Sequence, residues 1–161
     1  MFKFQLAQTV RDELSGFEGY IDNIVEHLYG CTRYCVTPPM RDGLIQDSIM
    51  FDEPQLSLVA EATFNPYPHP EKLIELGAYV VDPIRAITGV AMARAIYING
   101  CSRIMIQLQG VHHQEFLAVW AEEESLYHSK NVVGDIKYAV NKEKKPIKKS
   151  GGPMSGPSSK R

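Results

Sequence analysis

Short apolar runs alternate with polar turns along most of the chain, a pattern typical of β-strands. The first set of runs lies at residues 5–11, 21–28, 31–37, 48–51 and 57–60. The second set lies at residues 76–81, 91–98, 101–108 and 116–121, and a last short strand follows the turn at 121–126. Because each run is too short for a typical helix, we predict a mainly β protein.

The two sets of predicted strands align without a gap when the sequence is shifted by 70 residues. Nine identities fall within 51 aligned positions, and glycines, a cysteine and an arginine are among them. The identical pairs are Leu6/Leu76, Val10/Val80, Asp12/Asp82, Gly19/Gly89, Gly30/Gly100, Cys31/Cys101, Arg33/Arg103, Glu53/Glu123 and Leu56/Leu126. Since structurally special residues coincide, we interpret the chain as a tandem duplication.

Each repeat has the layout of an SH3-like small β-barrel, with five short strands and one tight turn before the last. Closure into a barrel would remove the exposed edges of a five-stranded meander. Asn99-Gly100 is a two-residue hairpin signal, and Tyr29-Gly30 holds the same place in the first repeat. The predicted organisation is a first barrel at residues 1–61, a proline-rich linker at 62–75, a second barrel at 76–129, and a C-terminal segment at 130–161 that carries a basic extended arm.

The linker contains the run Asn65-Pro66-Tyr67-Pro68-His69-Pro70. Prolines at alternate positions hold a chain extended and stiff, so we expect the linker to fix the spacing of the two barrels. A ligand segment for an SH3 or WW domain is the alternative interpretation.

Charge is distributed unevenly along the chain. Residues 142–161 have seven basic side chains and one acidic one, a net charge of +6, and the whole chain has −2, so residues 1–141 have −8. An acidic body with a basic tail suggests an interaction arm. The alternatives are a tail that only improves solubility and an arm that docks onto an acidic protein surface or nucleic acid. The basic residues of the arm are Lys142, Lys144, Lys145, Lys148, Lys149, Lys160 and Arg161.

No segment of the sequence is apolar enough to cross a membrane. The longest apolar run, at residues 116–121, has six residues, and a helix needs about 20 to span a bilayer. The N-terminal residues also lack a stretch long enough for a secretory signal. We therefore expect no membrane partner and a protein that stays in the cytosol where it is made.

The sequence contains no recognisable catalytic signature. It has no nucleophile in an elbow or helix-start context, no glycine-rich phosphate loop and no cysteine or histidine spacing suited to zinc. We therefore predict no enzymatic activity, no catalytic residues, no cofactor and no metal.

Three cysteines are present, and no disulfide is expected between the two nearest. Residues four apart on one strand lie about 13 Å from each other, which excludes a bond between Cys31 and Cys35. We interpret these two residues and Cys101 as small buried apolar side chains.

Arg33 and Arg103 occupy equivalent positions in the two repeats. Salt bridges to Asp12 and Asp82 are the first interpretation, because a repeated residue suggests a shared structural role. The alternative is an anion site formed by the two arginines between the barrels.

The repeated pattern is Val-x-Asp-x₆-Gly-x₁₀-Gly-Cys-x-Arg, and it closes with Phe-Asp-Glu-x-Gln-Leu in the first copy. It resembles small uncharacterised β-barrel proteins of tailed bacteriophages, whose copies read like Thr-Gly-Phe-x-Gly followed by Tyr-x-x-Gly-Cys. Residues 15–19 and 29–31 match this pattern in the first copy, whereas residues 87–89 and 97–101 match less fully because the second copy lacks the Gly-Phe pair. The resemblance covers residues 6–128 and leaves the tail unmatched.

This resemblance implies a phage origin and supplies no catalytic residues. Our first expectation is a structural protein of the phage particle, such as a head decoration or cement protein, made in the host cytoplasm and located in the virion. Its expected partners are other phage structural proteins, with the major capsid protein as a candidate, and further copies of itself; nucleic acid would bind only through the tail. The alternative is a soluble phage binding module that sequesters a host factor or a small anionic ligand.

Overall fold

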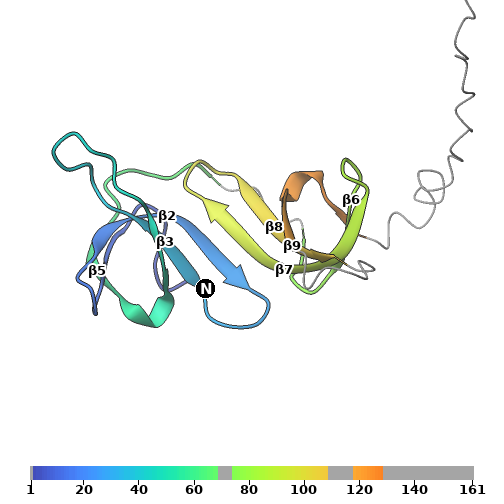
Figure 1. The fold of residues 1–161 in the computed structure, drawn as a ribbon, viewed down its shortest axis with the longest axis horizontal. Coiled ribbons are helices and arrows are strands. Elements are labelled where there is room, and N and C mark those ends of the chain that lie inside the picture. Colours follow the sequence, from blue (N-terminus) through green and yellow to red (C-terminus); the bar gives the residue numbers. More distant parts are fainter. Residues whose placement is uncertain (1, 69–73, 109–117, 129–161) are drawn as a thin grey trace, which may run out of the picture.

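The computed structural model describes residues 2–68, 74–108 and 118–128, which form ten antiparallel β-strands and two short 3₁₀ helices (Figure 1). The prediction of a mainly β protein is confirmed. Each predicted strand has a counterpart within a few residues of its expected place, and the differences lie at the strand ends.

The first half forms a five-stranded meander in the spatial order β5-β1-β2-β3-β4. A 3₁₀ helix, η1, forms the predicted tight turn between the fourth and fifth strands. The elements are β1 (Thr9–Asp12), β2 (Glu18–His27), β3 (Arg33–Thr37), β4 (Ile49–Asp52), η1 (Glu53–Gln55) and β5 (Leu56–Ala60).

The second half repeats this arrangement in the order β10-β6-β7-β8-β9, with η2 in the place of η1. Its elements are β6 (Tyr79–Asp82), β7 (Ile87–Tyr97), β8 (Ser102–Leu108), β9 (Ala118–Glu122), η2 (Glu123–Ser125) and β10 (Tyr127–His128). The two halves also agree in the details of strand pairing. The β2–β3 ladder shifts register between Ile21 and Asn23, and the β7–β8 ladder shifts between Ala91 and Ala93, 70 residues later.

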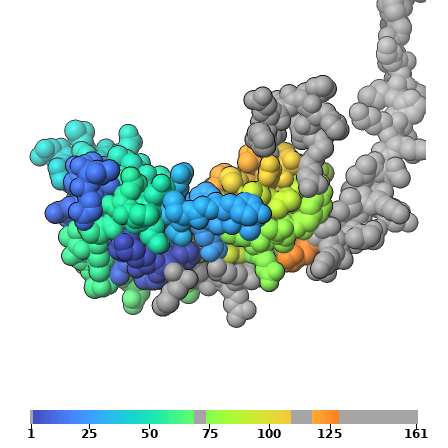
Figure 2. Space-filling view, turned by 90° about the horizontal axis from the view of Figure 1, so that it is seen from below, coloured from blue at the N-terminus to red at the C-terminus, as the bar shows by residue number. Residues whose placement is uncertain are grey.

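The two halves are joined by antiparallel pairing of β2 with β7, which makes one sheet of all ten strands. Val25 lies opposite Ala95, and these residues are equivalent in the repeat. An antiparallel contact between equivalent residues creates a local two-fold axis, so every contact across it has a mate. Accordingly, Leu28 donates a backbone hydrogen bond to Met92 and Ile98 donates one to Asp22, both at 2.8 Å. Figure 2 shows the two halves packed side by side.

The expected closed barrels are not found, because the sheet is open. Among the described residues no ladder joins β4 to β5 or β9 to β10. The long second strand of each half provides the place where the two halves join. Residues 18–20 of β2 pair with β1, but residues 23–27 run past β1 and offer a free edge, which β7 occupies. Pairing between the halves therefore covers the part of β2 that extends beyond β1, while the outer edges of β4 and β5 have no ladder between them in the described residues.

The hairpin turn at Asn99-Gly100 differs from the predicted two-residue type. Gly100 donates its N–H to the carbonyl of Tyr97, and Gly100 has φ +85° whereas Asn99 does not have a positive φ. Since a two-residue type I′ turn needs positive φ at both central residues, the turn belongs instead to the longer class in which a glycine in the left-handed region follows. Gly30, at φ +111°, occupies the equivalent place.

Each half has its own apolar core, and a third, smaller cluster lies at the two-fold axis. The first core includes Phe4, Leu6, Val10, Ile21, Ile24, Tyr34, Val36, Leu56 and Ile96. The second includes Ile74, Val80, Ala91, Ile104, Ile106, Ala121 and Leu126. The cluster at the axis consists of Val25, Ala93 and Ala95. Because side chains alternate along a strand, this third cluster lies on the opposite face of β2 and β7 from Ile24 and Ile96.

Candidate functional site

A palindromic row of side chains crosses six strands of the sheet. Directly paired residues of antiparallel strands point to the same face, so the row can be followed from one ladder to the next. It consists of Asp52, Arg33, Val25, Ala95, Arg103 and Glu122, on β4, β3, β2, β7, β8 and β9. The order is acid, arginine, small apolar residue, and then the reverse. We call this surface, together with the flanking rows described below, the two-fold face.

The two arginines of this row do not pair with the predicted aspartates. Arg33 Nε donates to Asp52 Oδ1 at 2.7 Å, and Arg103 Nε donates to Glu122 Oε1 at 2.7 Å. The error has a geometric cause, because the β3–β4 and β8–β9 ladders place these acids directly opposite the arginines. Asp12 and Asp82 are buried at the ends of β1 and β6, where the following turns begin.

Those two aspartates organise the turns in which they lie. Asp12 Oδ2 accepts hydrogen bonds from the backbone and hydroxyl of Ser15, at 2.7 and 2.6 Å, and these bonds lower the pKa of Asp12. Asp82 Oδ2 accepts a bond from Arg85 Nε at 2.6 Å. Burial raises the pKa of Asp82, but the hydrogen bonds from Arg85 and Ile84 outweigh burial and hold the pKa below its usual value.

The two-fold axis places Arg33 and Arg103 on the same face of the sheet. They are three strand spacings apart, roughly 14 Å between Cα atoms. Both side chains are about half exposed and each is held by a carboxylate, while Arg103 also lies over the ring of Tyr97 at 5.7 Å. An anion bound by both arginines would compete with Asp52 and Glu122, and the anion site stays a prediction.

Apolar and aromatic side chains flank the charged row on both sides. One flanking row contains His27, Ala93, Met105 and Trp120, and its two-fold mate contains Tyr97, Asn23, Cys35 and Met50. The outer ends of these rows are open to solvent, with 40% of Trp120 and 44% of Met50 exposed. Exposed apolar groups next to paired charges are typical of a protein-contact surface.

His27 lies beside the charged row and is partly buried. Its Nε2 atom is buried and has no hydrogen-bond partner among the described residues. Burial and the neighbouring Arg33 guanidinium both lower the pKa of His27, although Asp52 opposes them. The imidazole is therefore held neutral at physiological pH.

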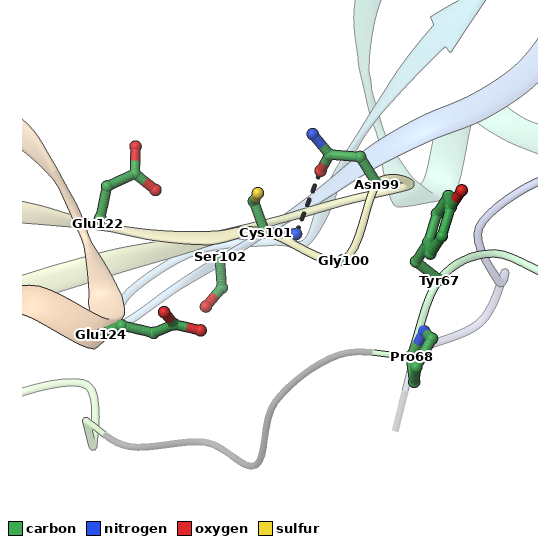
Figure 3. Close-up of a pocket in the computed structure, with 8 residues that line it drawn as sticks. All are labelled: Tyr67, Pro68, Asn99, Gly100, Cys101, Ser102, Glu122 and Glu124. Carbon is green, nitrogen blue, oxygen red and sulfur yellow. Dashed lines mark hydrogen bonds between the residues drawn. The ribbon is translucent and has the colours of Figure 1, made fainter.

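The linker creates a hollow that sequence reasoning missed. Tyr67 donates its N–H to the carbonyl of Ile98 at 3.2 Å, so the linker lies against the turn between β7 and β8. The hollow beside this contact has a volume of about 630 Å³, and Cys101, Glu122 and Glu124 are among the residues that line it (Figure 3). The proline run indicated a stiff connector but gave no sign of which surface it would touch.

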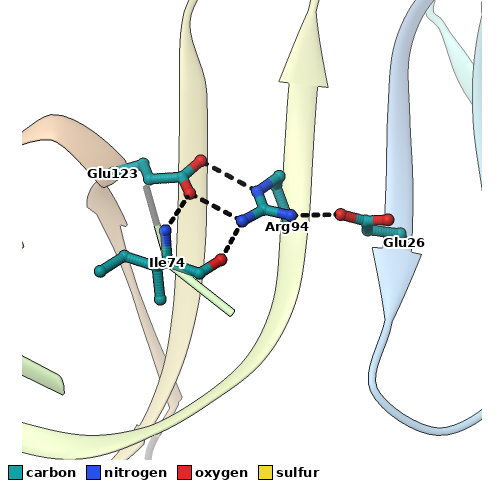
Figure 4. A network of polar contacts seen from close by, with 4 residues as sticks. All are labelled: Glu26, Ile74, Arg94 and Glu123. Carbon is teal, nitrogen blue, oxygen red and sulfur yellow. Dashed lines mark hydrogen bonds and ion pairs between the residues drawn. The ribbon is translucent and has the colours of Figure 1, made fainter. Parts of the chain in front are cut away.

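A buried ionic network also escaped prediction, and it joins the two halves (Figure 4). Arg94 Nε and Nη2 donate to the carboxylate of Glu123 at 2.9 and 2.7 Å, and Nη1 binds Glu26 of the first half. Nη2 also binds the carbonyl of Ile74, whose N–H binds Glu123 at 3.0 Å. Only 3% of Arg94 and 2% of Glu123 are exposed.

The cysteines differ from their predicted environment. Cys31 and Cys101 are exposed rather than buried, since each follows the glycine of a hairpin turn, and all three cysteines are free thiols. Cys35, on β3, is the most protected. Burial, with a further contribution from Asp22, raises the pKa of Cys35 to about 12.

We expect two of the three thiols to react with Ellman's reagent in the native protein at about pH 8. Cys31 and Cys101 are accessible, whereas Cys35 is neutral and partly shielded, and only the thiolate is nucleophilic. The third thiol should react after denaturation, which also provides the total count. Rapid reaction of all three thiols in the native state would contradict the described environment of Cys35.

The remaining predictions concern the basic arm, metal binding and membrane spans. The basic arm, Lys142, Lys144, Lys145, Lys148, Lys149, Lys160 and Arg161, lies outside the described residues. Within residues 2–68, 74–108 and 118–128 no group of three histidine, cysteine or acidic side chains is placed to hold a metal ion. The same residues contain no helix with the length and apolarity needed to cross a membrane.

Comparison of the chain with protein-family models, curated proteins and solved structures gives no significant match.

Proposed function

We propose that this chain is a non-enzymatic structural protein of a phage particle, a head decoration or cement protein built from two SH3-like units. The strand order β5-β1-β2-β3-β4, with a 3₁₀ turn before the last strand and a long second strand, supports the SH3-like assignment of each unit. The sequence resemblance to small tailed-phage proteins supports the phage origin. The protein would be made in the host cytoplasm and incorporated into the virion.

The observation that carries this proposal is the palindromic two-fold face. Particle lattices present the same protein repeatedly, and pairs of subunits in such lattices are often related by two-fold axes. A molecule whose two ends offer equivalent groups, Arg33 with Asp52 and Arg103 with Glu122, can make the same contact with two neighbouring subunits. The exposed Met50 and Trp120 at the ends of the flanking rows supply apolar contact area.

The charge distribution supports a second attachment through the arm. Residues 142–161 have a net charge of +6, and their composition offers few apolar side chains for a core. Such a segment can wrap an acidic surface of a structural protein and gain order on binding. The major capsid protein is the first candidate partner, and nucleic acid would bind only through this segment.

Purified particles, analysed by mass spectrometry, test the assignment. We expect the protein at a fixed stoichiometry in the virion, and its absence from purified particles would remove the structural proposal.

Deleting residues 142–161 should leave the melting temperature almost unchanged and weaken attachment to the particle. Attachment of the full chain should also weaken as salt rises, because exposed charges are screened over about 8 Å at physiological ionic strength. Equal attachment of both proteins across a salt series would show that the arm only improves solubility.

The second candidate function is a binding module that sequesters a host factor or a small anionic ligand. The observation that favours it is the placement of Arg33 and Arg103 on one face. Titration calorimetry with inorganic phosphate and with a nucleotide separates the two candidates, because a module for anions should bind one of them and lose binding in the Arg33→Gln and Arg103→Gln variants alike.

A further inference from the structure

The hollow beside the linker lies between the linker and the turn that joins β7 to β8 (Figure 3). A Cβ atom added at Gly100 would lie 3.0 Å from the carbonyl oxygen of Pro68 and 3.2 Å from Cβ of Tyr67. The linker backbone therefore touches the hairpin turn closely, and the glycine permits this approach. The hollow of about 630 Å³ beside this contact extends to Glu122 and Glu124.

A second, aromatic hollow of about 420 Å³ adjoins the first, and we call the two hollows together the groove. It shares Tyr67 and Asn99 with the first hollow and is also lined by Tyr20, Phe64 and Ile98. The rings are open to solvent, with 51% of Phe64 and 70% of Tyr67 exposed. Exposed aromatic side chains along an extended groove are typical of surfaces that bind proline-containing segments.

Among the residues that the structure describes, the lining of the groove carries a net negative charge. Glu124 makes no ion pair with any residue in the described part of the chain, and Glu122 shares its charge only with Arg103. None of the described residues that line the two hollows is basic. A ligand for this groove should therefore combine an apolar, extended stretch with positive charge.

We propose that the groove binds residues 142–149 of the same chain. This segment, Lys-Glu-Lys-Lys-Pro-Ile-Lys-Lys, places a proline and an isoleucine between pairs of lysines. Pro146 and Ile147 would pack against the rings of the aromatic hollow, and the flanking lysines would pair with Glu124 and Glu122. The inference goes beyond the proposed function and does not depend on a phage origin.

The length of the connecting chain allows this contact. The last described residue, His128, lies four positions after Glu124, so the described chain ends on the same unit as the groove. From His128 to Lys142 there are 14 residues, which can span at most about 48 Å. A tethered segment within reach has an effective concentration near the millimolar range, which favours binding within one molecule even when the intrinsic affinity is low.

The repeat provides an internal control for the test. Cys101 lines the groove, and Cys31 occupies the equivalent position after the other hairpin turn, where no linker lies opposite in the described structure. Alkylation of both thiols by a neutral reagent, iodoacetamide, can be followed in the full chain by peptide mass spectrometry. The ratio of the Cys101 and Cys31 rates then reports how often the groove is covered.

Neutralising the arm should uncover Cys101. In a variant with Lys144, Lys145, Lys148 and Lys149 replaced by glutamine, we expect Cys101 to react about fivefold faster, the factor that corresponds to losing one or two exposed ion pairs. The Cys31 rate should not change. An unchanged ratio of the two rates would overturn the proposal.

Variants of the groove test the same contact from the other side. Trypsin should cleave the arm after Lys148 and Lys149 faster in Tyr67→Ala and Glu124→Gln than in the unmodified chain. Tyr29→Ala and Glu13→Gln, which remove an exposed ring and an exposed acid from the first half, should leave the cleavage rate unchanged. Protection that disappears on dilution would overturn binding within one chain. Particle attachment is measured separately, so failure here leaves the proposed function standing.

Discussion

Replacing Arg94 by methionine is expected to lower the free energy of unfolding by about 3–5 kcal/mol, the range found when one partner of a buried ion pair is removed. The variant leaves the carboxylate of Glu123 buried without its guanidinium, and it also removes the contact with Glu26 across the joint between the halves. Chemical denaturation of the purified protein measures this change. Arg103→Met is the matched control, because it breaks an exposed pair and should cost at most about 1 kcal/mol.

A rescue variant distinguishes the loss of this partner from a loss of packing. The first half has a different partner for the equivalent glutamate, Glu53. Ile24 occupies the position equivalent to Arg94, and Tyr34 donates its hydroxyl to Glu53 at 2.7 Å. Adding Ile104→Tyr to Arg94→Ile transfers this arrangement to the second half. We expect the double variant to have a higher free energy of unfolding than Arg94→Ile alone. If Arg94→Met costs no more than Arg103→Met, the buried network does not stabilise the fold.

The same network predicts how the cost depends on pH. Burial raises the pKa of Glu123, but the hydrogen bonds from Arg94 and Ile74 have the larger, opposite effect. The pKa of Glu123 is therefore below its ordinary value of 4.5. A carboxyl group with a lowered pKa stabilises the fold above its unfolded-state pKa and loses this contribution as pH falls through its folded-state pKa. Without Arg94, burial dominates and the folded protein favours the protonated group. The stability difference between the two proteins should therefore begin to narrow above pH 4.5, where Glu123 of the variant becomes protonated, and it should continue to narrow until the pH falls below the lowered pKa of Glu123 in the unmodified protein.

Gly89→Ala is the second substitution with a large expected effect, about 3 kcal/mol of destabilisation, at the upper end of the range for overpacking. A Cβ at this position would lie 2.1 Å from the carbonyl oxygen of Gln107 and 2.7 Å from Cγ2 of Ile106. The oxygen belongs to the neighbouring strand β8, so the ladder itself would have to move. Gly19→Ala should have a similar effect, since its Cβ would lie 2.3 Å from the carbonyl oxygen of Thr37.

Gly16→Ala provides the control for both glycine variants. Gly16 has φ +71° and open space around its missing Cβ, and the second half already has Ala86 at φ 55° in the equivalent place. Its replacement should cost about 1 kcal/mol, the usual difference between alanine and glycine in such a conformation. Thermal denaturation of the three variants compares them directly. A cost for Gly89→Ala as small as that for Gly16→Ala would contradict the close approach of β7 and β8.

Local features were predictable from the sequence because they depend on short segments. The 70-residue repeat located the strands, the glycines at Gly30 and Gly100, and the turns that became η1 and η2. The pairing of β2 with β7 was not predictable, because it depends on how far β2 runs past β1 in the folded sheet. The partners of Arg33 and Arg103 followed from strand register, which the spacing of Asp12 and Asp82 did not reveal.

The candidate site shows the same division. Arg33 and Arg103 were identified as an equivalent pair, but the row in which they lie exists only because the halves meet at Val25 and Ala95. No sequence pattern indicated the role of Arg94, since its partners Glu26 and Glu123 are 68 and 29 residues away. The groove likewise depends on where the linker meets a hairpin turn.

The two-fold joint has a consequence for partner choice between the halves. Ile24 lies opposite Ile96, and the symmetry mate of this contact is Glu26 opposite Arg94. Two copies of the first half, joined in the same way, would place isoleucine against glutamate twice; two copies of the second half would place arginine against isoleucine twice. Either self-pairing would bury a charge against an alkyl side chain. Each half is thus matched to the other and mismatched to itself, so the joint favours the pairing that one chain already contains.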